Sequence, residues 1–150
     1  MSTAGRCATL LGIGRAPLAP GTAASLVALP FAWLIATAFG PVPMLALAIA
    51  AGLLAVPISG AYAKKIGRED PPDCVIDELA GQWLACAFAP LTWQGYTLAF
   101  VLFRLFDMTK LWPVSAAEKL RDGFGIVADD MVAGAMAGVI LLLAAQFGLL

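Results

Sequence analysis

Long stretches without charge alternate with short charged segments along this chain, and the pattern predicts helices that enter a membrane. Charged residues are absent from three ranges, which are 16–63, 79–103 and 131–150. Gly40-Pro41 interrupts the first range and predicts a turn between two apolar helices, at 23–39 and at 42–63. At ~1.5 Å per residue, each helix is long enough, or nearly so, for a ~30 Å hydrocarbon core.

The segment that precedes the first apolar helix is rich in glycine and proline. Residues 12–22 read Gly-Ile-Gly-Arg-Ala-Pro-Leu-Ala-Pro-Gly-Thr, a composition that disfavours helix and predicts a loop. Thr22 is expected to stand at the N-cap of the helix, where its hydroxyl would bond a free backbone N–H.

The middle of the chain predicts a third helix from Cys74 to Pro90 and a fourth from Trp93 to Lys110. The third carries Asp77 and Glu78 in its first turns, where carboxylates suit the helix dipole. The uncharged stretch 79–103 has 25 residues, too few for two full spans, which need ~40. It is therefore either one span or a shallow hairpin, and we favour the hairpin because it keeps the charged segments together.

The last part of the chain predicts a short amphipathic helix at 115–121, a flexible turn at 123–125 and a final helix. That helix opens with Asp129-Asp130 and runs to Leu150. Gly134 and Gly138 lie four residues apart in it, so another helix can approach closely there. The complete pattern predicts an all-α, compact, membrane-embedded bundle of five to six helices that forms a single domain over residues 1–150.

Composition agrees with a membrane protein. The chain is 61% hydrophobic and 13% charged, against about half and a quarter in soluble domains. A net charge of −1 gives no basic surface for nucleic acid. All nine lysines and arginines fall in the three charged segments, which the positive-inside bias places in the cytoplasm. With no histidine and three widely spaced cysteines, a zinc site or disulfide framework is not expected.

Arg104, Asp107 and Lys110 follow one another at intervals of three residues near the end of the fourth helix. Residues three apart are neighbours on a helix surface, so the three charges form a cation–anion–cation ridge. Arginine and lysine of this kind bind phosphate as a fork and a point charge. The alternative is a helix-end ion pair that faces lipid headgroups.

Carboxylates stand at the charged ends of three apolar helices, and we expect them to share one site. The candidate metal ligands are Asp77, Glu78, Asp107, Asp129 and Asp130. Five acids without histidine favour a hard cation, Mg²⁺ first and Mn²⁺ next. The candidate catalytic groups are Asp77, Asp130, Arg104 and Lys110, and the candidate phosphate-binding groups are Thr22, Ser25, Arg104 and Lys110. Alternatively, Asp129-Asp130 is a helix N-terminal pair and Asp77-Glu78 is solvated at the membrane surface.

Four ordered blocks resemble the phosphatidylglycerophosphatase A family over about residues 12–138. They are Gly12-Ile-Gly14 with Ala19-Pro-Gly-Thr22 and Ser25-Leu26; Val75-Ile-Asp-Glu78 with Gly81-Gln-Trp83; Phe103-Arg-Leu-Phe-Asp107 with Lys110 and Trp112-Pro113; and Gly125-Ile126 with Asp129-Asp130 and Ala133-Gly134. Leu111 stands where the family usually has proline, and Ala24 where glycine is common. Neither departure removes a charged or hydroxyl group.

The resemblance implies a Mg²⁺-dependent, multi-pass enzyme of the bacterial cytoplasmic membrane, with its active site on the cytoplasmic side. It would hydrolyse phosphatidylglycerol phosphate, a membrane phospholipid, to phosphatidylglycerol and phosphate. Two rivals are a phosphatidyltransferase, although Asp122-Gly123 lacks the expected Asp-Gly-x-x-Ala-Arg continuation, and a small cation or proton transporter. A purely structural membrane subunit would leave the acids unexplained. The number of metal ions and the oligomeric state stay open.

Overall fold

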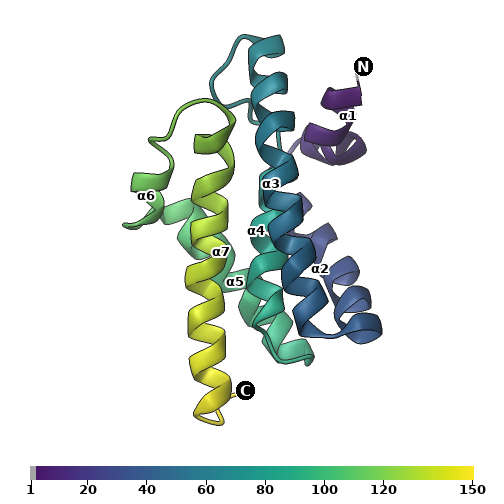
Figure 1. Cartoon of the computed structure of the whole chain (residues 1–150), viewed down its shortest axis with the longest axis vertical. Helices are drawn as coiled ribbons and strands as arrows, with labels where there is room; N and C mark the ends of the chain where they lie inside the picture. The colour runs from purple at the N-terminus through teal and green to yellow at the C-terminus, as the bar shows by residue number, and fades with distance from the viewer. Residues whose placement is uncertain (1–2) are drawn as a thin grey trace.

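The computed structural model describes residues 3–150, and every regular element in that range is a helix (Figure 1). The five longer helices are α2 (Pro20–Phe39), α3 (Pro41–Ile66), α4 (Ile76–Ala87), α5 (Trp93–Thr109) and α7 (Gly123–Gln146). Three short helices are α1 (Thr3–Ala8), the 3₁₀ helix η1 (Leu10–Arg15) and α6 (Val114–Ala117). The predicted all-α fold is confirmed. Helices α2, α3 and α7 are each long and apolar enough to cross a membrane, which supports the predicted membrane embedding.

Helix α4 lies at the centre of the bundle, where it contacts α2, α3, α5 and α7. Small residues bring α4 and α7 together, as the glycine spacing predicts. A Cβ atom on Gly134 would overlap the carbonyl oxygen of Gly81, and one on Gly138 would come 2.6 Å from the Phe88 ring. Ala133 and Ala137 of the same helix are fully buried. Backbone contact between α4 and α7 therefore fixes the middle of the bundle.

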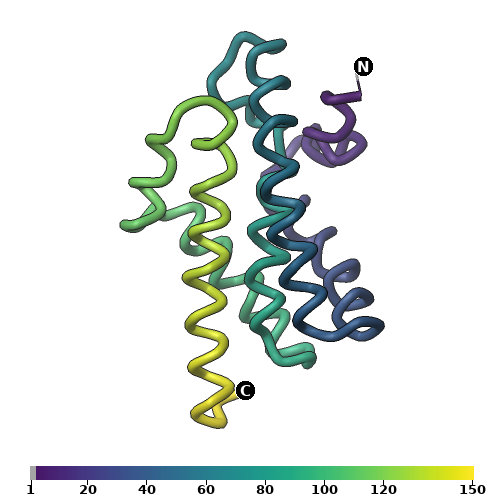
Figure 2. Tube along the Cα trace, in the orientation of Figure 1, coloured from purple at the N-terminus to yellow at the C-terminus, as the bar shows by residue number. Residues whose placement is uncertain are grey.

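Helices α4 and α5 pack against each other as a hairpin, and the trace shows the chain turning back between them at the lower end of the bundle (Figure 2). The hydroxyl of Thr92 caps α5 by accepting a hydrogen bond from the Gly95 N–H at 3.1 Å. With 12 residues, α4 extends only ~18 Å and cannot cross a bilayer by itself. The predicted hairpin is confirmed, and one continuous helix across 79–103 is wrong, because the chain turns between α4 and α5. The acidic start of α4 and the charged end of α5 consequently lie at the same end of the bundle.

Helix α2 begins at Pro20, three residues earlier than predicted, and η1 occupies part of the predicted loop. The N-cap of α2 is Ala19, in a left-handed conformation with φ 46°, and no side chain caps the helix. The predicted capping role of Thr22 is therefore wrong. Proline suits the first turn of a helix because its missing N–H would have no partner there.

Helix α7 begins at Gly123, six residues before Asp129, so the predicted flexible turn at 123–125 is wrong. A Cβ atom on Gly123 would come 2.8 Å from the backbone nitrogen of Gly60 in α3. Glycine serves close helix packing here, and its low helix propensity is overridden. Asp129 and Asp130 consequently lie in the second turn of α7, and the interpretation of this pair as an N-terminal cap is wrong.

Two other boundaries move by a few residues. Helix α3 continues to Ile66, so its last turn includes the lysines that were predicted to begin a loop. The predicted helix at 115–121 is shorter, because α6 ends at Ala117. The loop that leads into α4 is held by the N-terminal segment: Val75 N–H donates to the Ala8 carbonyl at 2.8 Å, and the Tyr62 hydroxyl of α3 donates to Asp73. These contacts fix the entry to α4, where the acids lie.

Candidate active site

A cleft of about 1010 Å³ opens where α4 begins and α5 ends. Its inner wall carries all five predicted carboxylates together with Lys110, and the second turn of α7 forms one side. The mouth is lined by charged side chains from the loop after α3 and from the connection between α6 and α7. The cleft is therefore polar and acidic inside an otherwise apolar bundle.

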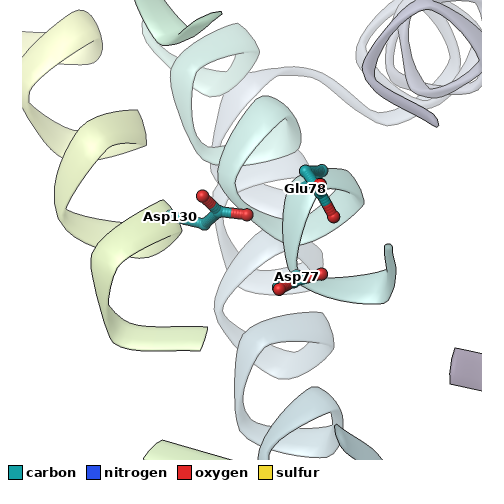
Figure 3. Close-up of side chains that lie close together, drawn as sticks. All are labelled: Asp77, Glu78 and Asp130. Atoms are coloured by element: carbon teal, nitrogen blue, oxygen red, sulfur yellow. The ribbon is translucent and has the colours of Figure 1, made fainter. Parts of the chain in front are cut away.

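The carboxylates form two groups that share Asp130. Asp77, Glu78 and Asp130 each offer an oxygen within 4.8 Å of the others, and so do Asp107, Asp129 and Asp130. Figure 3 shows Asp130 reaching from α7 toward Asp77 and Glu78 at the start of α4. The structure thus brings together acids that are more than fifty residues apart in sequence, as the shared-site hypothesis requires.

These acids are removed from water and incompletely paired. Asp77, Asp107, Asp129 and Asp130 are each less than a tenth exposed. Oδ1 of Asp77 and Oε2 of Glu78 are buried without a hydrogen-bond donor. An ionised carboxylate in such a place is costly unless a cation or a donor compensates it. The two oxygens without a donor therefore mark the α4 side as the place where a bound cation would compensate the carboxylates.

Two cations compensate the second group of carboxylates. Arg104 Nη1 donates to Asp107 Oδ2, and Lys110 Nζ lies 3.1 Å from Asp107 Oδ1. Lys110 also pairs with Asp129 of α7. The predicted cation–anion–cation ridge is confirmed. Lys110 lines the cleft and links α5 to α7 through Asp129, which favours a role in the site over a simple pair at the end of one helix.

The environment of Lys110 keeps its ammonium group charged. Burial alone would lower the pKa of Lys110, but the hydrogen bond and charge of Asp129, together with Asp107, raise that pKa overall. An ammonium that lines the cleft and stays protonated can bind an anionic ligand by Coulomb attraction.

Arg104, Thr22 and Ser25 do not line the cleft. Arg104 lies beside the first turn of α2, with its Nε buried and without a partner. The Ser25 hydroxyl is fully buried and donates to the Gly21 carbonyl at 2.9 Å. The structure therefore brings Lys110, but not these three candidate phosphate ligands, to the wall of the cleft.

Sequence reasoning missed Gly21, which controls the space behind Glu78. A Cβ atom at this position would collide with Oε1 of Glu78 and come 3.3 Å from Nη1 of Arg104. The signal was present as a glycine beside the predicted helix start, but it was interpreted as part of a loop. Glu78 and Arg104, both distant in sequence, explain why this position has no side chain.

Sequence reasoning also missed Asp70, a further carboxylate that lines the cleft. It lies in the loop between α3 and α4, and partial burial raises the pKa of this side chain, while the charge of Lys110 lowers it. The charged run 64–78 contained the residue, but no spacing distinguished it from the neighbouring solvated charges.

Comparison with known proteins gives one consistent family. A family model described as phosphatidylglycerophosphatase A matches residues 6–145. The phosphatidylglycerophosphatase A of Escherichia coli K12 is 37% identical over 133 residues, covering 87% of this chain and 76% of the relative. That of Haemophilus influenzae Rd is 34% identical over 141 residues, covering 93% and 86%.

A third relative carries a different substrate in its name. A protein of Bacteroides thetaiotaomicron, provisionally named a phosphatidylinositol-3-phosphatase, is 32% identical over 143 residues, covering 91% of this chain and 89% of the relative. The comparison with solved structures gave no significant match.

Proposed function

From the premise that this chain belongs to the phosphatidylglycerophosphatase A family and is a lipid phosphatase, we propose that it hydrolyses the terminal phosphate of phosphatidylglycerol phosphate. The reaction would take place in the acidic cleft, with Mg²⁺ held by the carboxylates. The observation that carries the proposal is Asp130, which belongs to both carboxylate groups and joins α4, α5 and α7 at one point. Carboxylates from three helices converge in this way where they hold a divalent cation.

The residues present fit such a cation. Five carboxylates face Arg104 and Lys110, so the cluster has three fewer positive than negative charges. Oδ1 of Asp77 and Oε2 of Glu78 are buried and have no hydrogen-bond partner, so both are free to serve as ligands. Oxygen donors of this kind suit Mg²⁺ or Mn²⁺, whereas Zn²⁺ prefers nitrogen and sulfur.

Cys74, the cysteine that lines the cleft, is a poor metal ligand and a poor nucleophile. Its thiol contacts the Ser59 hydroxyl at 3.3 Å, and burial raises the pKa of that thiol to about 11. A thiol that stays protonated at neutral pH neither coordinates a cation nor attacks phosphorus. The carboxylates are thus the groups of the cleft that can hold the ion.

The reaction is the addition of water to a phosphomonoester. A water oxygen forms a bond to phosphorus, the bond from phosphorus to the glycerol oxygen breaks, and phosphate and phosphatidylglycerol are released. When bound, Mg²⁺ would polarise the phosphoryl oxygens and favour ionisation of the attacking water. Asp77 and Asp130 are the candidates for the carboxylate that accepts the proton of that water.

Lys110 and Arg104 have different tasks in this proposal. Lys110 lines the cleft and would stabilise negative charge on the phosphoryl group in the transition state. Arg104 lies behind the carboxylates and holds Asp107, so it orients a ligand and does not contact the phosphate. The acyl chains of the substrate would stay in the bilayer beside the apolar helices, with the cleft on the cytoplasmic side.

Phosphate release from defined lipids tests the proposal. The purified protein in mixed vesicles should release phosphate from phosphatidylglycerol phosphate with Mg²⁺ or Mn²⁺, and lose this activity in EDTA. Mg²⁺ should also raise the melting temperature of the protein without substrate, because an ion that binds only the folded state stabilises it. Full turnover in EDTA, with metal content shown to be nil, would refute the metal assignment.

The same assay separates the rival functions. Phosphatidylinositol 3-phosphate, tested in parallel, decides between the substrates that the names of the relatives suggest. Ion flux across vesicles without any phosphate release would favour the transporter. Release of a nucleotide from a CDP-linked lipid would favour the phosphatidyltransferase.

A further inference from the structure

The connection between α5 and α7, residues 110–122, stands out because large apolar side chains surround it. They are exposed as follows: Met108 70%, Leu111 53%, Trp112 80%, Leu120 54% and Phe124 62%. We call these five residues the apolar flank. Figure 1 shows that α6, at the middle of the connection, projects sideways from the bundle beside α5 and α7. Exposed apolar side chains that gather around one short connection favour an interaction surface.

The apolar flank belongs to an ordered part of the protein. Val114 of α6 is fully buried and packs in the main hydrophobic core. A Cβ atom on Gly125 would come 3.0 Å from the carbonyl oxygen of Glu118, so the connection lies directly against the first turn of α7. Its apolar side chains are therefore held outward while its backbone is fixed to the bundle.

The opposite side of the same connection lines the cleft. Glu118, Lys119 and Arg121 belong to the cleft wall together with the five carboxylates. Leu120 of the apolar flank lines the cleft as well, so the connection joins the apolar flank to the charged wall of the cleft. A phospholipid also combines an apolar part, its acyl chains, with a charged part, its anionic headgroup.

We propose that the apolar flank lies in the interfacial region of the bilayer and that the lipid substrate enters the cleft from the bilayer across residues 110–122. This inference rests on the proposed function for the identity of the substrate. The flank adjoins α7, a helix apolar enough to cross a membrane, so its apolar surface continues that of the span. The indole of Trp112 has no hydrogen-bond partner among residues 3–150. Tryptophan is enriched at membrane–water interfaces, where such an indole can lie among the headgroups. Lys119 and Arg121 add attraction for anionic headgroups.

Depth-dependent quenching tests the position of the flank without using activity. Trp112→Cys, in a background free of the three native cysteines, is labelled with an environment-sensitive fluorophore and placed in vesicles that contain nitroxide lipids. We expect stronger quenching by a nitroxide near the headgroup than by one deep in the acyl chains. Val139→Cys, at an exposed position of α7, should show the reverse order, and Glu69→Cys should be quenched mainly by aqueous iodide.

Kinetics test the entry route. Leu111→Ser with Trp112→Ser should raise KM, expressed as the mole fraction of long-chain substrate in the vesicle, about tenfold, and change kcat by less than about twofold. With a short-chain, water-soluble phosphatidylglycerol phosphate, kcat/KM should stay unchanged. Phe147→Ser is the matched control, since Phe147 is 77% exposed at the other end of the bundle, and it should leave both substrates unaffected.

Each result decides the proposal. Quenching of the Trp112→Cys label by iodide alone would overturn it, as would energy transfer between labels on two chains, which would assign the flank to a second copy of this protein. Equal losses with both substrates would overturn the entry route. If the wild-type protein released no phosphate from either lipid, the proposed function would fail, but quenching would still decide where the flank lies.

Discussion

Gly21, in the first turn of α2, lies so close to Glu78 of α4 that a single methyl group on it would overlap the Glu78 carboxylate. Fifty-seven positions separate the two residues in sequence. The absence of a side chain at position 21 leaves room for an acid of the cleft, and α2 thereby takes part in the site without contributing a polar group to its wall.

Gly21→Ala should weaken metal binding without destabilising the fold. The methyl group would meet the end of a flexible side chain, which can move, and alanine favours helix over glycine by ~1 kcal/mol. We expect the melting temperature of the metal-free protein to stay level or rise, while the Mg²⁺ concentration for half-maximal activity rises about tenfold, or ~1.4 kcal/mol. Metal titrations of activity and of melting temperature measure both effects.

Gly52→Ala is the matched control for this change. Its Cβ atom would lie 2.8 Å from the sulfur of Met131, which is also the end of a flexible side chain but lies outside the cleft. The metal requirement of this variant should stay at the wild-type value. Equal metal requirements in both variants would show that the position of Glu78 does not matter for the ion.

Asp129→Asn separates a metal ligand from a structural residue. The amide keeps the size of the side chain but removes a charge that faces Lys110 and the shared carboxylate Asp130. Turnover should fall at least about a hundredfold, roughly 2.7 kcal/mol on the barrier scale, with helix content and detergent-solubilised size unchanged. Asp107→Asn should behave likewise.

Cys86→Ser, buried in α4 outside both carboxylate groups, should remain active and serves as the control for Asp129→Asn. A folded Asp129→Asn protein with near-normal, metal-dependent activity would move the ligand assignment from Asp129 to Asp130.

Thiol labelling determines the orientation of the cleft in the membrane. Arg68 and Lys119 both line the cleft, so cysteines at these positions should react with an impermeant reagent from the same side, which we expect to be the cytoplasmic side. Leu149, which is 76% exposed at the far end of α7, provides the opposite reference. The substitutions are made in a protein without native cysteines and assayed in inside-out and right-side-out vesicles. Reaction of all three from one side would contradict the arrangement of α7 as a span.

The native Cys74 thiol should react slowly at neutral pH and faster as the pH rises. Burial raises its pKa to about 11, so at pH 8 only about one thiol in a thousand is ionised. Alkylation by iodoacetamide, followed by mass spectrometry, should increase close to tenfold per pH unit between pH 8 and 10. Cys7, which is exposed, gives the reference for an accessible thiol in the same sample. A rate for Cys74 that does not change with pH would contradict the raised pKa.

The positions of the charged residues in the sequence predicted which segments of the chain form the candidate site. Because charged residues gather in three segments, the hairpin of α4 and α5 could be inferred before any contact was known. The spacing of Arg104, Asp107 and Lys110 predicted their ion pairs, since neighbours at i and i+3 meet on any α-helix. Both inferences depend only on local geometry and on the exclusion of charge from lipid.

Gly123 and Gly125 misled the prediction because both serve contacts with distant parts of the chain. Gly123 and Gly125 have the composition of a turn, but α3 and the backbone of residues 118–120 fill the space where their side chains would be. The start of α7 therefore depends on a contact with Gly60, sixty-three positions earlier, which no local pattern records. With that start misplaced, Asp129 and Asp130 were open to interpretation as a helix cap.

The contact of Gly81 with α7 has a consequence for the size of ion that the cleft can accept. A Cβ atom on Gly81 would lie 2.6 Å from the carbonyl oxygen of Asp130 itself, so main-chain atoms set how far this acid stands from Asp77 and Glu78. Mg²⁺ takes oxygens at ~2.0–2.1 Å and Ca²⁺ at ~2.3–2.6 Å, usually with more of them. The two helices cannot move closer, and moving them apart to make room for the larger ion would open the packed centre of the bundle. If the carboxylates hold Mg²⁺ as proposed, the backbone contact of Gly81 with Asp130 would favour the smaller ion.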